Sequence, residues 1–296
     1  MTPRNLVLPV AFTLLLGSAL VFGRPAQGEV EIRVQPVAGA VHVAFGQGGN
    51  IGLSVGDDGV LMVDDQFAQL AAKIEAAIDA LSDAPVSLLV NTHWHGDHTG
   101  GNEHFGAMAT ILAHDNVRRR LVDAAPPMPE VGRPTITYAD GVSIHFNGEE
   151  IRVLHVPTGH TDGDSVVWFT GSKVVHMGDL FFQASYPYVD LGSGGDVHGL
   201  IAACKRVLAL VPADTKVIPG HGQVTDPAGL REYVAMLEEV VTRVQHSLGA
   251  GMTAQQMLDD GLLADFEPRW GGGGFMPAER FLPIVAQNLA QKRSKD

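Results

Sequence analysis

NTHWHGDHTGG, residues 91–101, places four side chains that bind metals within six positions of the chain. His93 and His95, two residues apart, point at one metal when the backbone between them is extended. Asp97 and His98 reach a neighbouring metal as the chain turns, and the glycines of this stretch permit a tight turn. Imidazole and carboxylate together suit zinc, and a histidine-rich site without thiolate is typical of catalytic zinc. The stretch therefore predicts a catalytic metal centre.

Apolar runs of strand length precede this segment. Val86–Val90 leads directly into it and is continuously apolar apart from one serine, as expected for a central strand covered on both faces. Leu70 to Leu81 repeats apolar residues at helical spacing, which predicts a helix with Asp64 or Asp65 as its cap. Short strands separated by glycine and aspartate turns are predicted further upstream, at Val41–Phe45, Ile51–Val55 and Val60–Val63.

The second half of the chain repeats this alternation of strands and helices. Strands are predicted at Ile151–Val156, Ser165–Phe169, Lys173–His176 and Lys216–Ile218, with a helix near Leu200–Leu210. From Asp226 onward the spacing is helical, and Thr253 is predicted to cap the next helix. Ala124–Pro134 and Trp270–Phe275 have the composition of mobile loops. The alternation predicts an α/β protein in which two mixed sheets pack together with helices outside, a four-layer αββα sandwich.

Three further motifs, together with the segment 91–101, resemble the pattern of the metallo-β-lactamase superfamily. Pro157-Thr-Gly-His160-Thr-Asp is similar to its third-histidine motif, and His176-Met-Gly-Asp179-Leu to its bridging-carboxylate motif. Ile218-Pro-Gly-His221-Gly is similar to its terminal-histidine motif. All of them fall at predicted strand ends in the family's order, and the similarity extends over nearly all of the chain that follows residue 28.

The resemblance implies two zinc ions per chain. It assigns His93, His95 and His160 to the first zinc, Asp97, His98 and His221 to the second, and Asp179 to a bridge between them. Two Zn²⁺ ions that share a water lower its pKa from about 15.7 toward 7, so a metal-held hydroxide is the expected nucleophile. Asp97 is the expected catalytic residue, orienting the hydroxide and then protonating the leaving group.

Charge and the N-terminus constrain the partners and the compartment. The formal net charge of −13 disfavours a nucleic-acid partner, because such binding neutralises phosphates with Lys and Arg. Arg4, the apolar run 6–22 and the small residues of Ala26-Gln-Gly28 predict a signal peptide over residues 1–28, followed by one catalytic domain over 29–296. We therefore expect a periplasmic or secreted protein with no stable membrane contact after cleavage. The alternative is an uncleaved membrane anchor.

Other reactive residue types are given ordinary roles. Cys204, the one cysteine, lies at the spacing of a buried helix face and is expected to be a core thiol. Surface or core roles are assigned to seven histidines that are not predicted ligands, namely His42, His104, His114, His145, His155, His176 and His246. Candidate supports for the ligand imidazoles are Thr92, Thr99, Thr158 and Thr161, which serve equally well as ordinary polar residues.

Two loops resemble segments that enclose substrate in the family. They are Phe45–Gly49 and Tyr186–Gly195, and an apolar wall beside the metals is a hypothesis for Phe181, Phe182, Tyr186 and Tyr188. Ordinary packing is the alternative for these four aromatic residues.

The substrate is expected to be a small molecule with a hydrolysable acyl bond. Export and a loop similar to that of periplasmic β-lactamases favour β-lactam opening as the leading hypothesis. Asp179 stands where typical β-lactamases of the family carry cysteine or serine, and Phe182 where they carry a lysine that binds the drug's carboxylate. Thioester hydrolysis of the glyoxalase II type, or lactone hydrolysis, is the alternative. Sulfur oxidation at a single iron is a third, which the complete set of seven ligands disfavours. The oligomeric state stays open.

Overall fold

The computed structural model describes residues 29–271 and 276–293. The predicted signal peptide, 1–28, lies outside the described residues, as does most of the glycine-rich stretch that ends at Phe275. Within the described part of the chain, no helix is both long and apolar enough to span a bilayer.

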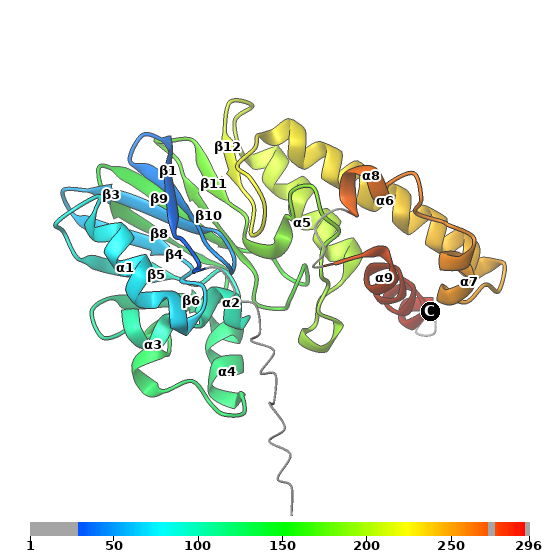
Figure 1. Ribbon diagram of the computed structural model, residues 1–296, viewed down its shortest axis with the longest axis horizontal. Coiled ribbons are helices and arrows are strands. Elements are labelled where there is room, and N and C mark those ends of the chain that lie inside the picture. The colour runs from blue at the N-terminus through cyan, green and yellow to red at the C-terminus, as the bar shows by residue number, and fades with distance from the viewer. Residues whose placement is uncertain (1–28, 272–275, 294–296) are drawn as a thin grey trace, which may run out of the picture.

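Two mixed sheets form the centre of the protein (Figure 1). The strands of the first sheet follow chain order: β1 (Arg33–Ala38), β2 (Val41–Phe45), β3 (Ile51–Gly56), β4 (Gly59–Val63), β5 (Val86–Val90), β6 (Thr110–His114) and β7 (Ile136–Tyr138). The second sheet has the order β12 (Lys216–Ile218), β11 (Val174–His176), β10 (Ser165–Phe169), β9 (Glu149–His155) and β8 (Gly141–Phe146).

Helices cover the outer faces of both sheets, and α6 to α9 continue to one side of them (Figure 1). The helices near the first sheet are α1 (Ala71–Asp79), α2 (Gly96–Thr99), α3 (Asn102–Phe105) and α4 (Asp115–Asp123). Those near the second are α5 (Val197–Leu210), α6 (Pro227–Gly249), α7 (Ala254–Asp259), α8 (Glu267–Trp270) and α9 (Ala278–Arg293). Single 3-10 turns connect them at η1 (Ala68–Leu70), η2 (Glu130–Gly132), η3 (Gly178–Leu180) and η4 (Leu191–Ser193).

Three apolar cores separate these layers and explain why the sheets stack. Alternate residues of the strands meet between the sheets, where Leu61, Val90 and Phe169 share one buried cluster. The opposite face of the first sheet packs on α1 through Ile74. The second sheet packs on α5 and α6 in the largest cluster, which includes Cys204. The predicted four-layer αββα sandwich is confirmed.

Most predicted strands and helices are present, and the misses have physical reasons. The predicted cap of the first helix is wrong: η1 and α1 begin without a side-chain cap, because Asp64 and Asp65 are turned into the protein interior. Thr253 caps α7 as predicted, in a capping box with Gln256. Trp270, predicted at the start of a mobile loop, ends α8 and is buried.

Candidate metal centre

Strand direction gathers the seven predicted ligands at one edge of the sandwich. β9, β11 and β12 run the same way in the second sheet, so their carboxyl ends lie at one edge. His160, Asp179 and His221 follow these three ends, and residues 93–98 follow β5 of the facing sheet. The convergence therefore comes from topology, although the residues lie far apart in the sequence.

The first group consists of His93, His95, His160 and Asp179. His95 Nδ1 lies 3.2 Å from His93 Nε2 and 2.8 Å from His160 Nε2. Asp179 Oδ2 lies 3.8 Å from His93 Nε2 and 3.5 Å from His160 Nε2. Four donor atoms thus face one common point.

The second group consists of Asp97, His98 and His221. Asp97 Oδ2 lies 3.7 Å from His98 Nε2 and 3.3 Å from His221 Nε2, and the two histidine nitrogens are 3.4 Å apart. Asp179 turns its other oxygen, Oδ1, to this group, 3.0 Å from His98 Nε2 and 3.4 Å from His221 Nε2. Asp179 is thus the one side chain shared by both groups.

These separations fit a metal ion. Ligands about 2.0–2.1 Å from a tetrahedral zinc lie roughly 3.4 Å from one another, close to the distances within each group. Asp179 Oδ1 is buried and accepts no hydrogen bond despite the nearby imidazoles. Because a buried carboxylate oxygen without a partner is costly, a cation between the groups would supply what the protein leaves unmet.

Asp64 fixes the rings of two predicted ligands from the end of β4. Its Oδ2 accepts hydrogen bonds from His98 Nδ1, at 2.8 Å, and from the Thr92 hydroxyl, at 2.7 Å. The same hydroxyl lies 3.0 Å from His93 Nδ1, so the chain of bonds aims Nε2 of both rings at the centre. Asp64 has a positive φ of 61° and is fully buried. Asp64 was predicted as a possible helix cap, so its bonds to Thr92 and His98 were not expected from the sequence.

The other candidate threonines do not contact the ligand rings. Thr99 donates to the backbone carbonyls of Trp94 and His95, and Thr161 donates to Asp164. Thr158 is exposed. Of the four candidates, Thr92 alone contacts a ligand imidazole.

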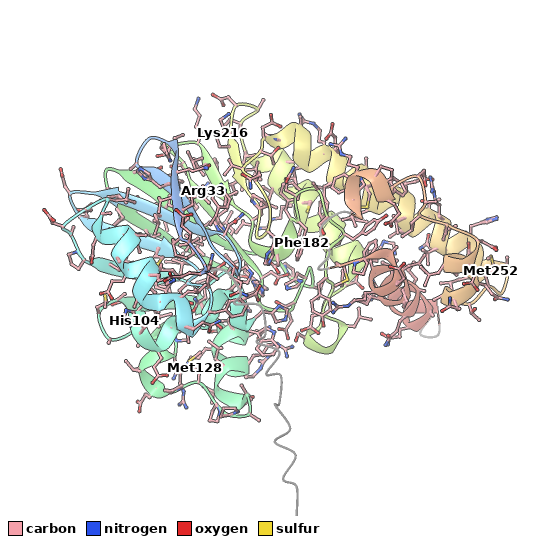
Figure 2. All side chains as sticks on the ribbon, viewed as in Figure 1. Arg33, His104, Met128, Phe182, Lys216 and Met252 are labelled. Atoms are coloured by element: carbon pink, nitrogen blue, oxygen red, sulfur yellow. The ribbon has the colours of Figure 1, made fainter. Side chains whose placement is uncertain are left out.

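The aromatic residues of the predicted apolar wall divide into two pairs. Phe182 stacks on His221, with ring centroids 5.2 Å apart, and Tyr188 lies 5.9 Å from His95. Phe181 packs on Tyr233, and Tyr186 stacks on Phe281, both away from the ligands. Figure 2 shows Phe182 between the sheets and the C-terminal helices.

A glycine hairpin between β2 and β3 closes over the second group. The backbone N–H of Gly49 donates to the Asp97 carbonyl at 3.0 Å. A Cβ at Gly49 would come within 2.1 Å of the His98 ring, so only glycine allows this approach. The hairpin therefore lies close enough to border a substrate on the second group.

Burial keeps two ligand imidazoles neutral. Desolvation lowers the pKa of His160 to about 4, and it lowers the pKa of His93 well below its usual value, with His98 adding to the effect. Neutral imidazole is the form that coordinates metal. Burial alone would raise the pKa of the Asp97 carboxyl, but His98 and His221 hold it below its ordinary value. The first group is thus ready to coordinate a cation at neutral pH.

Comparison with known families agrees with this geometry. The family profile of the metallo-beta-lactamase superfamily matches residues 44–242, which contain all seven predicted ligands. The chain belongs to the metallo-beta-lactamase superfamily. As a member it is a metallo-hydrolase, and its histidine and aspartate groups are suited to a divalent metal, for which zinc is typical in this superfamily.

Relatives within the superfamily differ in their named activities. A hydroxyacylglutathione hydrolase of Rhodospirillum rubrum is 32% identical over 160 residues, which are 53% of this chain and 56% of that protein. A type 2 metallo-beta-lactamase of Bacteroides fragilis is 23% identical over 181 residues, 57% of this chain and 70% of that protein. The chain thus spans about half the length of the hydroxyacylglutathione hydrolase.

The fold is also that of solved metallo-beta-lactamases. The structure of the enzyme from Pontibacter korlensis matches with a TM-score of 0.62 at 20% identity, covering 70% of this chain and 99% of that one. Because the sequence identity is only 20%, this match supports the fold and not the activity.

Proposed function

We propose that the protein is a dinuclear zinc hydrolase of small acyl thioesters or lactones. The first zinc would be held by His93, His95 and His160, and the second by Asp97, His98 and His221. The observation that carries the dinuclear centre is the placement of Asp179, whose two oxygens face different ligand groups. A centre with a single iron, as in sulfur oxidation, would use only one of the two ligand groups and would leave the other without a metal.

Zinc bound here would supply a hydroxide at neutral pH and would polarise the acyl carbonyl. Asp97 is suited to move the proton, because its side chain is 25% exposed whereas that of Asp179 is 5% exposed. Asp97 Oδ2 lies 3.3 Å from His221 Nε2, so the carboxylate is held by the second group at its solvent side. From there it can accept a proton from water and return it to the leaving group.

Phe182 supports the choice of thioesters or lactones over β-lactams. It occupies the position three residues after Asp179 and is 1% exposed, with its ring flat on His221 at an interplanar angle of 12°. A buried phenyl ring cannot bind the carboxylate of a β-lactam drug as a lysine would. The similarity to the hydroxyacylglutathione hydrolase supports the same choice.

β-Lactam opening, the leading hypothesis of the sequence analysis, becomes the second candidate. The similarity to the Bacteroides fragilis enzyme favours it. We also propose that the protein acts after export, as the N-terminal 28 residues predict, on a small molecule and not on nucleic acid.

Turnover of three substrates tests the proposal. We expect kcat/KM of the zinc-loaded protein to be at least tenfold higher for a short acyl thioester or a γ-lactone than for a chromogenic cephalosporin. Asp97→Ala should lower it by about 10²-fold or more, within the range of general acid–base catalysis. Asp83→Ala, on the exposed surface, is the matched control and should not change it. A higher value for the cephalosporin would replace the first candidate by the second, and full activity of Asp97→Ala would contradict the proposed role of Asp97.

A further inference from the structure

The segment 186–195, which we term the ligand loop, holds the outer nitrogens of two histidines in the first group. Asp190 Oδ2 lies 3.0 Å from His95 Nε2, and the Tyr188 carbonyl lies 2.7 Å from His160 Nδ1. Each contact fixes the ring so that its other nitrogen faces the metal position. The loop thus orients the two rings whose inner nitrogens lie 2.8 Å apart.

Asp190 is itself held firmly by backbone groups. Its N–H donates to the His160 carbonyl at 3.0 Å, and its Oδ1 accepts from the Ser193 N–H at 3.2 Å. Its side chain is 13% exposed. The carboxylate therefore has one oxygen for the loop and one for His95, which is the geometry of a fixed carboxylate–histidine pair.

Helices beyond the family match hold the start of the ligand loop. The match ends at residue 242, whereas α8 and α9 follow it. The Tyr186 hydroxyl donates to Glu267 of α8 at 3.1 Å, and the Tyr186 N–H donates to the Trp270 carbonyl at 3.0 Å. The Tyr186 ring stacks on Phe281 of α9, with centroids 4.8 Å apart.

The two residues that directly follow the ligand loop, Asp196 and Val197, are held by α9. Asn288 Oδ1 accepts from the Val197 N–H at 3.0 Å, at the first residue of α5. Lys292 forms an ion pair of 2.6 Å with Asp196, the N-cap of α5. The start of the ligand loop and the residues that directly follow it are therefore attached to the C-terminal helices.

We propose that Asp190 is a positioning residue for His95, and that α8 and α9 set the zinc affinity of the first group through the ligand loop. In the second group, His98 is oriented by Asp64 at the end of β4 and not by this loop. The inference rests on the proposed zinc centre. It assigns His95 and His160 of the first group to the ligand loop, so Asp190 can be removed without loss of the bond that orients His98.

Stepwise zinc dissociation constants, measured by competition with a chromogenic chelator, test this inference. Asp190→Ala should weaken one of the two sites by about 10- to 100-fold, as is usual when the hydrogen-bond partner of a ligand is lost, and Asp190→Asn by less. Tyr186→Phe, which removes only the hydroxyl bonded to Glu267, should weaken the same site by a few-fold. Asp64→Ala is the comparison variant and should weaken the other site more, because Asp64 bonds to His98 directly and reaches His93 only through Thr92.

Two further readouts separate positioning from a general loss of structure. The imidazole N–H proton of His95, shifted downfield by its carboxylate partner, should move upfield in the NMR spectrum of metal-free Asp190→Ala. The melting temperature of this metal-free variant should stay within a few degrees of the unmodified protein.

The outcomes are distinguishable. Two zinc ions bound to the unmodified protein, with both affinities unchanged in Asp190→Ala or both lowered equally, would overturn this inference alone. Unmodified protein that binds no zinc would overturn the proposed function and this inference with it.

Discussion

Removal of the Asp64 carboxylate should destabilise the protein more than the loss of any exposed charge. In Asp64→Ala, three buried donors lose their acceptor: the Thr92 N–H, the Thr92 hydroxyl and His98 Nδ1, at 2.7, 2.7 and 2.8 Å. Each buried donor left unpaired costs about 1–3 kcal/mol. Because water can reach part of the vacated space, we take the lower half of that range, a total of about 3–6 kcal/mol for the three donors.

The backbone at Asp64 adds to this cost. Its φ is 61°, a left-handed conformation that aspartate tolerates and alanine disfavours by about 1 kcal/mol. The expected loss of unfolding free energy is therefore about 4–7 kcal/mol, a large share of the total stability of most proteins. At about 2–4 °C per kcal/mol, the melting temperature should fall by roughly 8–28 °C.

Urea and thermal unfolding with a chelator present measure this effect without a contribution from bound metal. Asp57→Ala is the control, because Asp57 is exposed in the turn between β3 and β4. It should change stability by less than about 0.5 kcal/mol. Asp64→Asn, which keeps one acceptor and tolerates the positive φ, should lose less than alanine. An Asp64→Ala protein within about 1 kcal/mol of the unmodified one would refute the reasoning.

Two further predictions concern residues outside the centre. Cys204 is a buried core thiol, and burial raises its pKa far above the ordinary value. Cys204→Ala should therefore lower the unfolding free energy, measured with urea, by about 1 kcal/mol and leave zinc content and turnover unchanged. Loss of zinc would contradict this prediction. His114 and His155 stack with ring centroids 3.7 Å apart. Desolvation lowers the pKa of both, and the charge of a protonated His155 lowers the pKa of His114 further. Because the unfolded state then binds more protons, their contribution to stability is complete above about pH 6.5 and is lost as the pH falls through the lowered values. The unfolding free energy should therefore drop less between pH 7.5 and 5.5 in His155→Gln than in the unmodified protein, and an identical drop would refute the assignment.

The sequence was informative where local pattern and chemistry coincide. Val86–Val90 is apolar because both sheet faces are covered, and the ligand-rich stretch that follows it has to lie at a strand end. Helical spacing similarly located α5 and α6. Edge strand β8 was missed because its residues alternate between half-buried and exposed, which leaves a weaker apolar signal.

Long-range hydrogen bonds were beyond the reach of local pattern. An aspartate shortly before a helical segment is typical of a cap, yet Asp64 bonds to Thr92 and His98, 28 and 34 residues later. Asp190 lies within the predicted loop Tyr186–Gly195, but its role in orienting His95 was not predicted, because His95 lies 95 residues earlier in the sequence. The ligands were identifiable from motifs, whereas the residues that orient them depend on how the loops fold back.

The metal content of the purified protein tests the central claim most directly. We expect two zinc ions per chain by mass spectrometry of the elements, both removed by a chelator, with activity restored when zinc is returned. Asp179→Ala should retain fewer than two, because its carboxylate faces both groups. A single iron per chain, or two zinc ions retained in Asp179→Ala, would contradict a dinuclear centre bridged by this residue.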